Sequence, residues 1–580
     1  MERPISKLKA LRAVLVTILV VMGVVAVSAG SSSDHLGRDW MAQLYCVDAE
    51  YWTGGRTAAG RCPFPEAERL NASRPHNIGF AFSGGGTRSA AATIGQLRGS
   101  QANGWLSKVR YLSAVSGGAW AAAPFVFSHD TPDRLLGTAD CATDLKEPCG
   151  TLAEAVANSK VASCGSLLVA YNRISKALGL QPPNAGKCAP TLADDRTFSA
   201  LIGNLFFTDK ICSGCAARPF SWDAASQVRE WQANERFGSL SIPSADRPFL
   251  VVGGTVVDAN ANYQYPRLLP LEMTPMYAGV RQHVAGGFGG HYLSGWAYGM
   301  PAVGSPTAQG AVRVSGESAQ FLTLRDVLGI TGSAPMLSLY LGPERFSKAM
   351  QAAAGLFPKR GHWALTRDAV GPHHGGVPHG DGGFTDNLGI MPLLARKVGY
   401  IIAFVNAKGP FRNNRDIEAL FHPMPDQDAG GTRRHNAVFP PARHAELVKA
   451  LEDAARQGTA LACLKEVSVG KSQFYNIQAY ERLNICFVYN QDVAAWREGL
   501  PPVVRDSLAK NTDSFANFPW YRTFGEGSAD GPSLIDLDVP QVNLLADLSS
   551  WNVTHPPNRA AIEQAIPVLT DGRPGVPVQR

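Results

Sequence analysis

Ser116 lies in a segment whose residue types suit a catalytic nucleophile. The stretch Ala114-Val115-Ser116-Gly117-Gly118 nearly matches the G-x-S-x-G nucleophile elbow, with alanine in place of the first glycine. An elbow is a sharp turn between a strand and a helix, and small flanking residues let the backbone turn while the serine hydroxyl stays accessible. The N-terminus of the following helix favours developing negative charge. A Ser-Gly-Gly turn can also be purely structural, so this motif alone leaves both interpretations open.

A run of three glycines earlier in the chain offers backbone amides to an anion. Gly84, Gly85 and Gly86 follow an apolar segment, and consecutive glycines let several N–H groups converge on one point. Together with the amide of Gly117 they form the predicted oxyanion hole for an acyl-transfer intermediate. A structural glycine turn is the alternative. A phosphate loop is excluded, because no Gly-Lys-Ser/Thr follows and Ser89 occupies the last glycine position of G-x-G-x-x-G.

Arg88 follows the glycine run directly. A guanidinium pairs well with phosphate, so Arg88 is the predicted substrate-binding residue for an anionic group such as a lipid phosphate. Two alternatives stay open, namely that Arg88 braces the glycine loop or that it forms a surface salt bridge.

Asp381 is the predicted proton acceptor for the serine. It stands in the sequence Gly380-Asp381-Gly382-Gly383, and glycine neighbours allow a carboxylate to approach another loop closely. A serine nucleophile needs a base within hydrogen-bond reach. Asp386 is the competing carboxylate, and by position it can equally cap a turn.

Three histidines precede Asp381, namely His373, His374 and His379, in the Gly/His-rich stretch 371–383. They can be solvated side chains of a loop, ligands of a metal, or the third member of a Ser-His-Asp triad. A metal-dependent hydrolase built on these histidines is therefore one alternative function. A membrane-anchored binding protein that has lost activity is another.

The motifs together resemble the patatin-like and cytosolic phospholipase A2 superfamily, including its lysophospholipase branch. The resemblance rests on GGGTR at 84–88, YLSAVSGGAW at 111–120, LEMTPMYAG at 271–279 and DGG at 381–383, in the order of that family. It covers roughly residues 76–410.

The resemblance implies a patatin-like three-layer α/β fold, with a mostly parallel central sheet flanked by helices and a cysteine-containing insertion. It implies a Ser116–Asp381 dyad without histidine, an acyl-enzyme intermediate and no cofactor. The implied partners are a membrane lipid or lysolipid substrate and the membrane surface.

The sequence predicts the strands and helices on either side of the glycine run 84–86 and of Ser116. Apolar runs at 78–82 and 109–115 each end in a glycine turn, and small-residue helical stretches follow at 90–97 and 119–123. Two successive strand–glycine–helix units predict a parallel sheet with crossover helices. Further along we predict strands at 248–257, 400–405 and 485–489, helices at 321–328, 390–394 and 542–548, and a loop at 371–383.

The chain of 580 residues suggests a large domain with insertions or two domains. Apolar residues make up 45% and charged residues 18%, which is typical of a globular protein. The net charge is +6, of which residues 1–12 contribute +3, and no basic cluster follows, so nucleic acid is not an expected partner. The predicted divisions are a signal peptide or anchor at 1–30, an extension at 31–75, a catalytic domain at 76–410 with an insertion at about 129–245, and a C-terminal part at 411–580.

The N-terminal segment and the cysteines both indicate export. Residues 13–33 carry no charge and follow a basic stretch, as in a signal peptide or a retained membrane anchor. The expected location is therefore membrane-anchored, periplasmic or secreted. Ten cysteines are available for disulfides in such a compartment, and Cys212-Ser-Gly-Cys215 is expected to form a local or nearby disulfide rather than a zinc or redox site.

Overall fold

The computed structural model describes residues 38–46, 64–159, 161, 196–234, 239–258, 267–281, 289–307, 310–334, 357–366, 369–424, 435–521 and 536–571. The predicted leader at 1–30 lies outside these ranges. Within them, no helix combines the length and the apolar character that a bilayer crossing requires.

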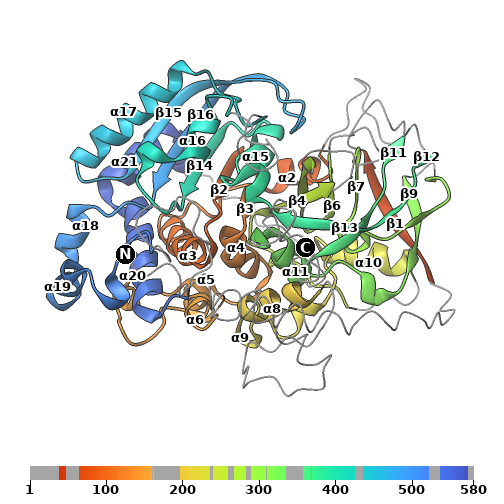
Figure 1. Ribbon diagram of the computed structural model, residues 1–580, viewed down its shortest axis with the longest axis horizontal. Coiled ribbons are helices and arrows are strands. Elements are labelled where there is room, and N and C mark those ends of the chain that lie inside the picture. Colours follow the sequence, from red (N-terminus) through yellow and green to blue (C-terminus); the bar gives the residue numbers. More distant parts are fainter. Residues whose placement is uncertain are drawn as a thin grey trace, which may run out of the picture.

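A mixed sheet of 14 strands runs through the molecule in the order β15-β16-β14-β2-β3-β4-β5-β6-β7-β1-β9-β8, with β10 and β13 attached beside β4. Its strands are β1 (Arg38–Cys46), β2 (Ile78–Phe82), β3 (Tyr111–Val115), β4 (Phe249–Asp258), β5 (Arg267–Met273), β6 (Tyr277–Gly279), β7 (His291–Ser294), β8 (Ala302–Val303), β9 (Ala311–Gly316), β10 (Lys359–His362), β13 (His374–Asp381), β14 (Tyr400–Val405), β15 (Leu461–Val469) and β16 (Tyr480–Tyr489). Figure 1 shows β15 and β16 at one end of the molecule and β1 and β9 at the other.

Only the centre of this sheet is parallel. The strands β16, β14, β2, β3 and β4 are parallel neighbours. From β4 onward the pairing is antiparallel, through β5, β6, β7, β1 and β9. Short connections such as that from β5 to β6 can join only antiparallel neighbours. The prediction of an α/β fold is confirmed, but "mostly parallel" describes the core strands and not the whole sheet.

Helices cover both faces of the parallel centre. The α-helices among the described residues are α2 (Ala67–Ser73), α3 (Gly86–Ala102), α4 (Gly117–Phe127), α5 (Pro132–Leu136), α6 (Thr151–Ala157), α8 (Thr197–Phe206), α9 (Asp209–Cys212), α10 (Ala224–Ala233), α11 (Leu324–Thr331), α14 (Gly383–Asp386), α15 (Met391–Ala395), α16 (Arg415–Ala419), α17 (Ala442–Arg456), α18 (Ala494–Gly499), α19 (Pro502–Lys510), α20 (Val539–Thr554) and α21 (Pro556–Ala565). On β2, Gly79 faces Leu393 of α15, whereas the Phe82 side chain faces Gly118 of α4. Side chains alternate between the two faces of a strand, and residues 79 and 82 are an odd number of positions apart. Helices α15 and α4 therefore lie on opposite faces of the sheet.

Helix α20 packs closely on α3, the helix that begins at the glycine loop. Gly95 and Gly99 lie one helical turn apart on α3, and a methyl group on Gly95 would stand 1.8 Å from the carbonyl oxygen of Ala546. On Gly99 it would stand 2.3 Å from Val553. Glycine at these two positions therefore lets the two helix backbones come together.

Most predicted elements are confirmed. Residues 78–82 and 400–405 are β2 and β14 with the predicted bounds, and the other predicted strands and helices differ from the structure at their ends. The predicted loop at 371–383 is wrong, because His374–Asp381 form β13. This segment has the Gly, His and Pro content of a loop, but it gains ladder hydrogen bonds from β4 and β10.

Three disulfides lie within the described residues. Two join cysteines that are close in sequence, Cys141–Cys149 and the C-x-x-C pair Cys212–Cys215. The third joins Cys463 of β15 to its register partner Cys486 of β16. The local disulfide expected for Cys212-Ser-Gly-Cys215 is confirmed. Of the remaining four cysteines, Cys46 is the last residue of β1, and Cys62, Cys164 and Cys188 lie outside the described ranges.

Candidate active site

Ser116 occupies a sharp turn between β3 and α4. Its backbone has φ 51° and ψ −126°, and residues other than glycine rarely adopt such a positive φ. The turn is held from outside, because the Ser116 amide donates to Thr331 Oγ1 at 2.8 Å. Thr331 ends α11, and its hydroxyl donates in turn to the Gly253 carbonyl at 2.6 Å. The predicted elbow is therefore present, with Ser116 in a strained backbone conformation.

Two strands meet end to end along one edge of β4, and this meeting brings Ser116 and Asp381 together. β3 runs parallel to β4 and ends with Val115 opposite Gly253. β13 runs antiparallel to β4 and ends with Asp381 opposite the next residue, Gly254. Close approach at this point needs glycine, since a methyl group on Gly382 would lie 2.4 Å from the Gly253 carbonyl oxygen.

Ser116 and Asp381 form a buried hydrogen-bonded pair. Ser116 Oγ donates to Asp381 Oδ2 at 2.8 Å. The other carboxylate oxygen accepts the Gly383 amide at 2.7 Å, and the Asp381 carbonyl accepts the Thr255 hydroxyl at 2.8 Å. Ser116 is 7% exposed and Asp381 3%. Burial raises the pKa of Asp381 to about 7, while the bonds from Gly383 and Ser116 hold it down.

The glycine loop lies against the elbow. Gly85 has φ 141° and Gly86 has φ 63°, conformations that need glycine. A methyl group on Gly117 would stand 1.8 Å from the Gly86 carbonyl oxygen, and one on Gly84 would stand 3.3 Å from Ser116 Cβ. The first two motifs of the sequence are thus in direct backbone contact.

Only part of the predicted oxyanion hole has amides to offer. Gly84 donates its amide to the Asn387 carbonyl at 2.8 Å, so the prediction that Gly84 belongs to the hole is corrected. Gly86 and Gly117 are the first residues of α3 and α4, where amides have no intrahelical acceptor. In the part of the chain that the structure describes, no acceptor contacts the amides of Gly85, Gly86 or Gly117.

Arg88 is buried, and its guanidinium binds backbone carbonyls. It is 4% exposed, and its guanidinium donates to the carbonyls of Asn406 at 3.4 Å and Trp520 at 3.0 Å. These bonds tie the start of α3 to the end of β14 and to the C-terminal part. The structure therefore favours the bracing role over the predicted contact with a lipid phosphate.

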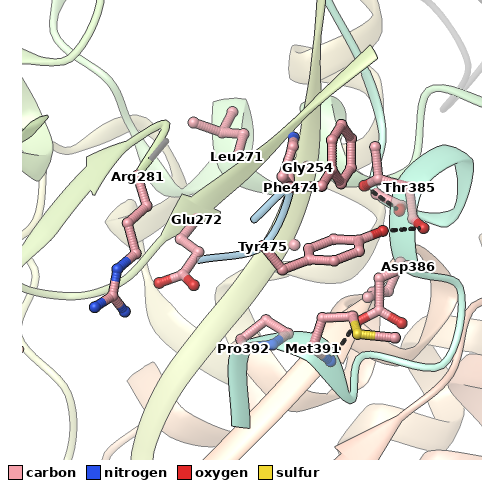
Figure 2. Close-up of a pocket in the computed structure, with 14 residues that line it drawn as sticks. Gly254, Leu271, Glu272, Arg281, Thr385, Asp386, Met391, Pro392, Phe474 and Tyr475 are labelled. Carbon is pink, nitrogen blue, oxygen red and sulfur yellow. Dashed lines mark hydrogen bonds between the residues drawn. The ribbon is translucent and has the colours of Figure 1, made fainter. Parts of the chain in front are cut away.

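Asp386, the competing carboxylate, caps the turn before α15. Its two oxygens accept the amides of Gly389 at 3.1 Å and Met391 at 2.7 Å. Burial and the nearby carboxylate of Asp416 raise its pKa to about 7. It lines a cavity of about 30 Å³, enough for a water molecule, beside Tyr475, whose hydroxyl donates to the Thr385 carbonyl (Figure 2). Asp386 has no hydrogen bond to Ser116 in the described structure, so its role here is structural.

The histidines before Asp381 do not reach the serine. His379 is buried, with Nε2 hydrogen-bonded to the Tyr298 hydroxyl and Nδ1 to the Val377 carbonyl, both at 2.8 Å. Burial lowers the pKa of His379 to about 4. His373 is exposed and His374 partly so. Among the described residues, no three His, Cys, Asp or Glu side chains gather as metal ligands would.

Several residues that shape the site were not predicted. The pair Gly253-Gly254 inside a predicted strand was a usable signal, because glycines in a strand interior often mark close backbone approach. Asn406 was a second signal, as a polar residue at the carboxyl end of a parallel strand. No sequence signal marked Thr331 or Asn387, because threonine at a helix end and asparagine in a turn are both common.

No protein-family profile and no curated protein sequence matches the chain. The chain is similar in structure to human GIVD cytosolic phospholipase A2. One solved structure of that protein covers 86% of this chain and 63% of its own, with a TM-score of 0.46 and 14% sequence identity. A second, in complex with methyl gamma-linolenyl fluorophosphonate inhibitor and terbium chloride, covers 86% and 60%, with a TM-score of 0.41 and 15% identity. The chain thus spans less than two thirds of the length of the chains in these two solved structures.

Proposed function

We propose that this protein is a serine hydrolase that cleaves ester bonds in lipids, with Ser116 as the nucleophile and Asp381 as the general base. The observation that carries the proposal is the 2.8 Å hydrogen bond from Ser116 Oγ to Asp381 Oδ2. The accepting carboxylate has a pKa of about 7 because it is buried. A base whose pKa lies near the working pH takes and returns a proton efficiently.

The reaction is acyl transfer to water in two halves. Asp381 accepts the hydroxyl proton while Ser116 Oγ bonds to the ester carbonyl carbon. The carbonyl oxygen takes the negative charge, and the amides of Gly85, Gly86 and Gly117 stabilise it. When the carbonyl re-forms, the C–O bond to the alcohol breaks, and the alcohol leaves with the proton from Asp381. Water then attacks the acyl carbon and gives its proton to Asp381. The bond from that carbon to Ser116 Oγ breaks, Oγ takes the proton back from Asp381, and the carboxylic acid leaves.

The lipid part of the proposal is supported by the order of the sequence motifs, which resembles that of lipid acyl hydrolases. Phospholipid and lysophospholipid are the proposed substrates, and a membrane surface is the proposed place of contact. Every step above uses side chains and amides of this chain, so no cofactor is proposed.

We also propose that the protein acts outside the cytoplasm, carried there by residues 1–30 as a signal peptide or anchor. Basic residues ahead of an uncharged stretch support this route. The described disulfides Cys141–Cys149, Cys212–Cys215 and Cys463–Cys486 fit an oxidising compartment.

The test compares three variants on p-nitrophenyl butyrate, on a panel of phospholipids and lysophospholipids, and with a fluorophosphonate probe. Ser116→Ala and Asp381→Asn should each lower the hydrolysis rate by several orders of magnitude, as expected for groups that act as a unit. Asp386→Asn is the matched control, because it removes a carboxylate of similar burial and pKa five residues away.

The probe should label wild type at Ser116 and leave Ser116→Ala unlabelled. A folded wild type that resists the probe and hydrolyses no ester would favour the inactive binding protein. If Asp386→Asn were the more damaging change, the base would be Asp386. If p-nitrophenyl butyrate were cleaved and no lipid were, the dyad would stand and the substrate class would not.

A further inference from the structure

The end of β14 lies beside the start of the glycine loop. β14 and β2 are parallel neighbours with Phe404 opposite Phe82. The ladder continues one step past β2, where the Ser83 amide donates to the Phe404 carbonyl at 3.1 Å. The next polar residue after β14 is Asn406, which is 1% exposed. Its position places it at the point where β2 gives way to the loop.

Asn406 joins both ends of the glycine loop to each other and to α3. Its backbone amide donates to Ser83 Oγ at 2.7 Å, and Ser83 directly precedes the loop. Its side-chain Nδ2 donates to Ser89 Oγ at 2.9 Å, after the loop. Its Oδ1 accepts from Gln96 Nε2 at 2.6 Å, two turns further along the helix. Ser89 completes the ring by donating its hydroxyl to the Ser83 carbonyl at 2.5 Å.

These bonds enclose the residues that carry the oxyanion amides. The loop residues Gly84, Gly85 and Gly86 lie between Ser83 and Ser89 in sequence. A methyl group on Gly85 would stand 2.9 Å from the Asn406 carbonyl oxygen, so the two backbones are in contact. All members of the ring are buried. A buried, mutually bonded set of this kind has few alternative arrangements, which fixes the direction of the loop amides.

We propose that Asn406 is a positioning residue for the oxyanion loop, holding the amides of Gly85 and Gly86 in place through Ser83 and Ser89. This inference rests on the proposed function, because it assigns Asn406 a part in the same acyl transfer. Amides stabilise a developing oxyanion only when they point at the place it will occupy, and loss of one such donor typically costs a hundredfold to a thousandfold in kcat. Asn406 does not contact the reacting atoms.

The test uses Asn406→Asp, which keeps the shape and the acceptor for Gln96 but removes the donor to Ser89. The matched control is Asn543→Asp on α20. Asn543 is fully buried, and its Nδ2 is likewise a hydrogen-bond donor, here to the backbone carbonyls of Asp144 at 2.7 Å and Glu147 at 2.8 Å. Both changes remove a buried donor, so both should lower the melting temperature, and only one touches the loop.

The readouts are kcat and KM for p-nitrophenyl butyrate and inhibition by an alkyl trifluoromethyl ketone, whose adduct with serine carries an oxyanion. We expect Asn406→Asp to lower kcat at least about tenfold, with KM within about twofold, and to weaken inhibition by a similar factor. Asn543→Asp should leave all three values within about twofold of wild type. Ser89→Ala removes the other half of the contact with a smaller change, and it should lower kcat in the same way even if Asn406→Asp fails to fold.

Unchanged kcat in folded Asn406→Asp or Ser89→Ala would overturn the positioning role, as would equal kcat losses in Asn406→Asp and Asn543→Asp. Those results would leave the dyad intact if wild type still reacts with a fluorophosphonate at Ser116. Failure of wild type itself to hydrolyse esters or to react at Ser116 would instead overturn the proposed function and the positioning role with it.

Discussion

The backbone of Ser116 is strained, and a hydrogen bond to Thr331 stabilises it in this conformation. A non-glycine residue in a sparsely populated backbone region costs of order 1–3 kcal/mol. The Thr331 hydroxyl offsets part of this cost by accepting the Ser116 amide and donating to Gly253. The turn at Ser116 therefore depends on the hydroxyl of Thr331, which lies 215 residues further along the chain.

Thr331→Val should lower the free energy of unfolding by about 1–3 kcal/mol, because it leaves a buried amide without its acceptor. It should also lower kcat, since the nucleophile loses its anchor. Chemical denaturation and esterase kinetics measure the two effects. Thr93→Val is the control, because Thr93 is buried and no partner contacts its hydroxyl in the described structure. Equal unfolding free energies for the two variants would contradict the role of Thr331.

If Asp381 is the general base, its pKa should set the pH dependence of the proposed reaction. Its pKa is raised from 3.8 to about 7 by burial. Below that pH the carboxyl group holds its own proton and cannot accept that of Ser116, so kcat/KM should rise with pH through about 7. A rate profile with an apparent pKa near 4 would contradict a buried base.

Stability should respond to pH in the opposite direction. The folded state binds the Asp381 proton more tightly than the unfolded chain, so this group stabilises the fold at low pH and loses that contribution as pH rises from about 4 to 7. Asp386 has the same raised pKa and adds to the same slope. Asp386→Asn should therefore flatten the dependence of stability on pH while leaving the kinetic profile in place.

At the scale of elements, the packing of α20 on α3 supports the helix that starts at the oxyanion loop. Gly95→Ala should lower the free energy of unfolding by about 1–3 kcal/mol, because the new methyl group meets the backbone of Ala546, which cannot move aside as a side chain could. Thermal unfolding measures this. The control is Gly499→Ala, where a methyl group would have nothing within 4 Å. A Gly95→Ala protein as stable as the control would mean that the two helices can separate at little cost.

Elements with a strong local pattern were predictable, and elements defined by their neighbours were not. β2 and β14 are continuous apolar runs bounded by polar residues or glycines, which is typical of buried parallel strands. β13 has no such pattern, because its ladder partners β4 and β10 determine its conformation rather than its own residues. The antiparallel strands β5, β6, β7, β1 and β9 were not predicted for the same reason.

The candidate site divides in the same way. The pairing of Ser116 with Asp381 was predictable from residue type and flanking glycines. The roles of Gly84 and Arg88 were not, because they depend on acceptors such as the carbonyls of Asn387 and Trp520, which only the fold brings close.

At the scale of the whole molecule, disulfides should account for most of the ten cysteines. Three described bridges use six of them, which leaves at most four thiols. Thiol titration of denatured, unreduced protein from its native host should therefore find no more than four. Ten free thiols would contradict both the bridges and the proposed compartment. Reduced protein should melt at a lower temperature, since removing disulfides typically costs 2–5 kcal/mol in small secreted domains and acts in the same direction here.

The ends of β3 and β13 meet on β4, so the Ser116–Asp381 pair can form only after both segments have been synthesised. Ser116 and Asp381 are 265 residues apart. Chains are synthesised from the N-terminus at about 5–20 residues per second, so the nucleophile is made roughly 13 to 53 s before its base. During that interval the growing chain carries a serine with no proton acceptor. If the proposed reaction is correct, a cell that makes this protein is protected from it until Asp381 has been made, because lipid cleavage can begin only after β13 docks on β4.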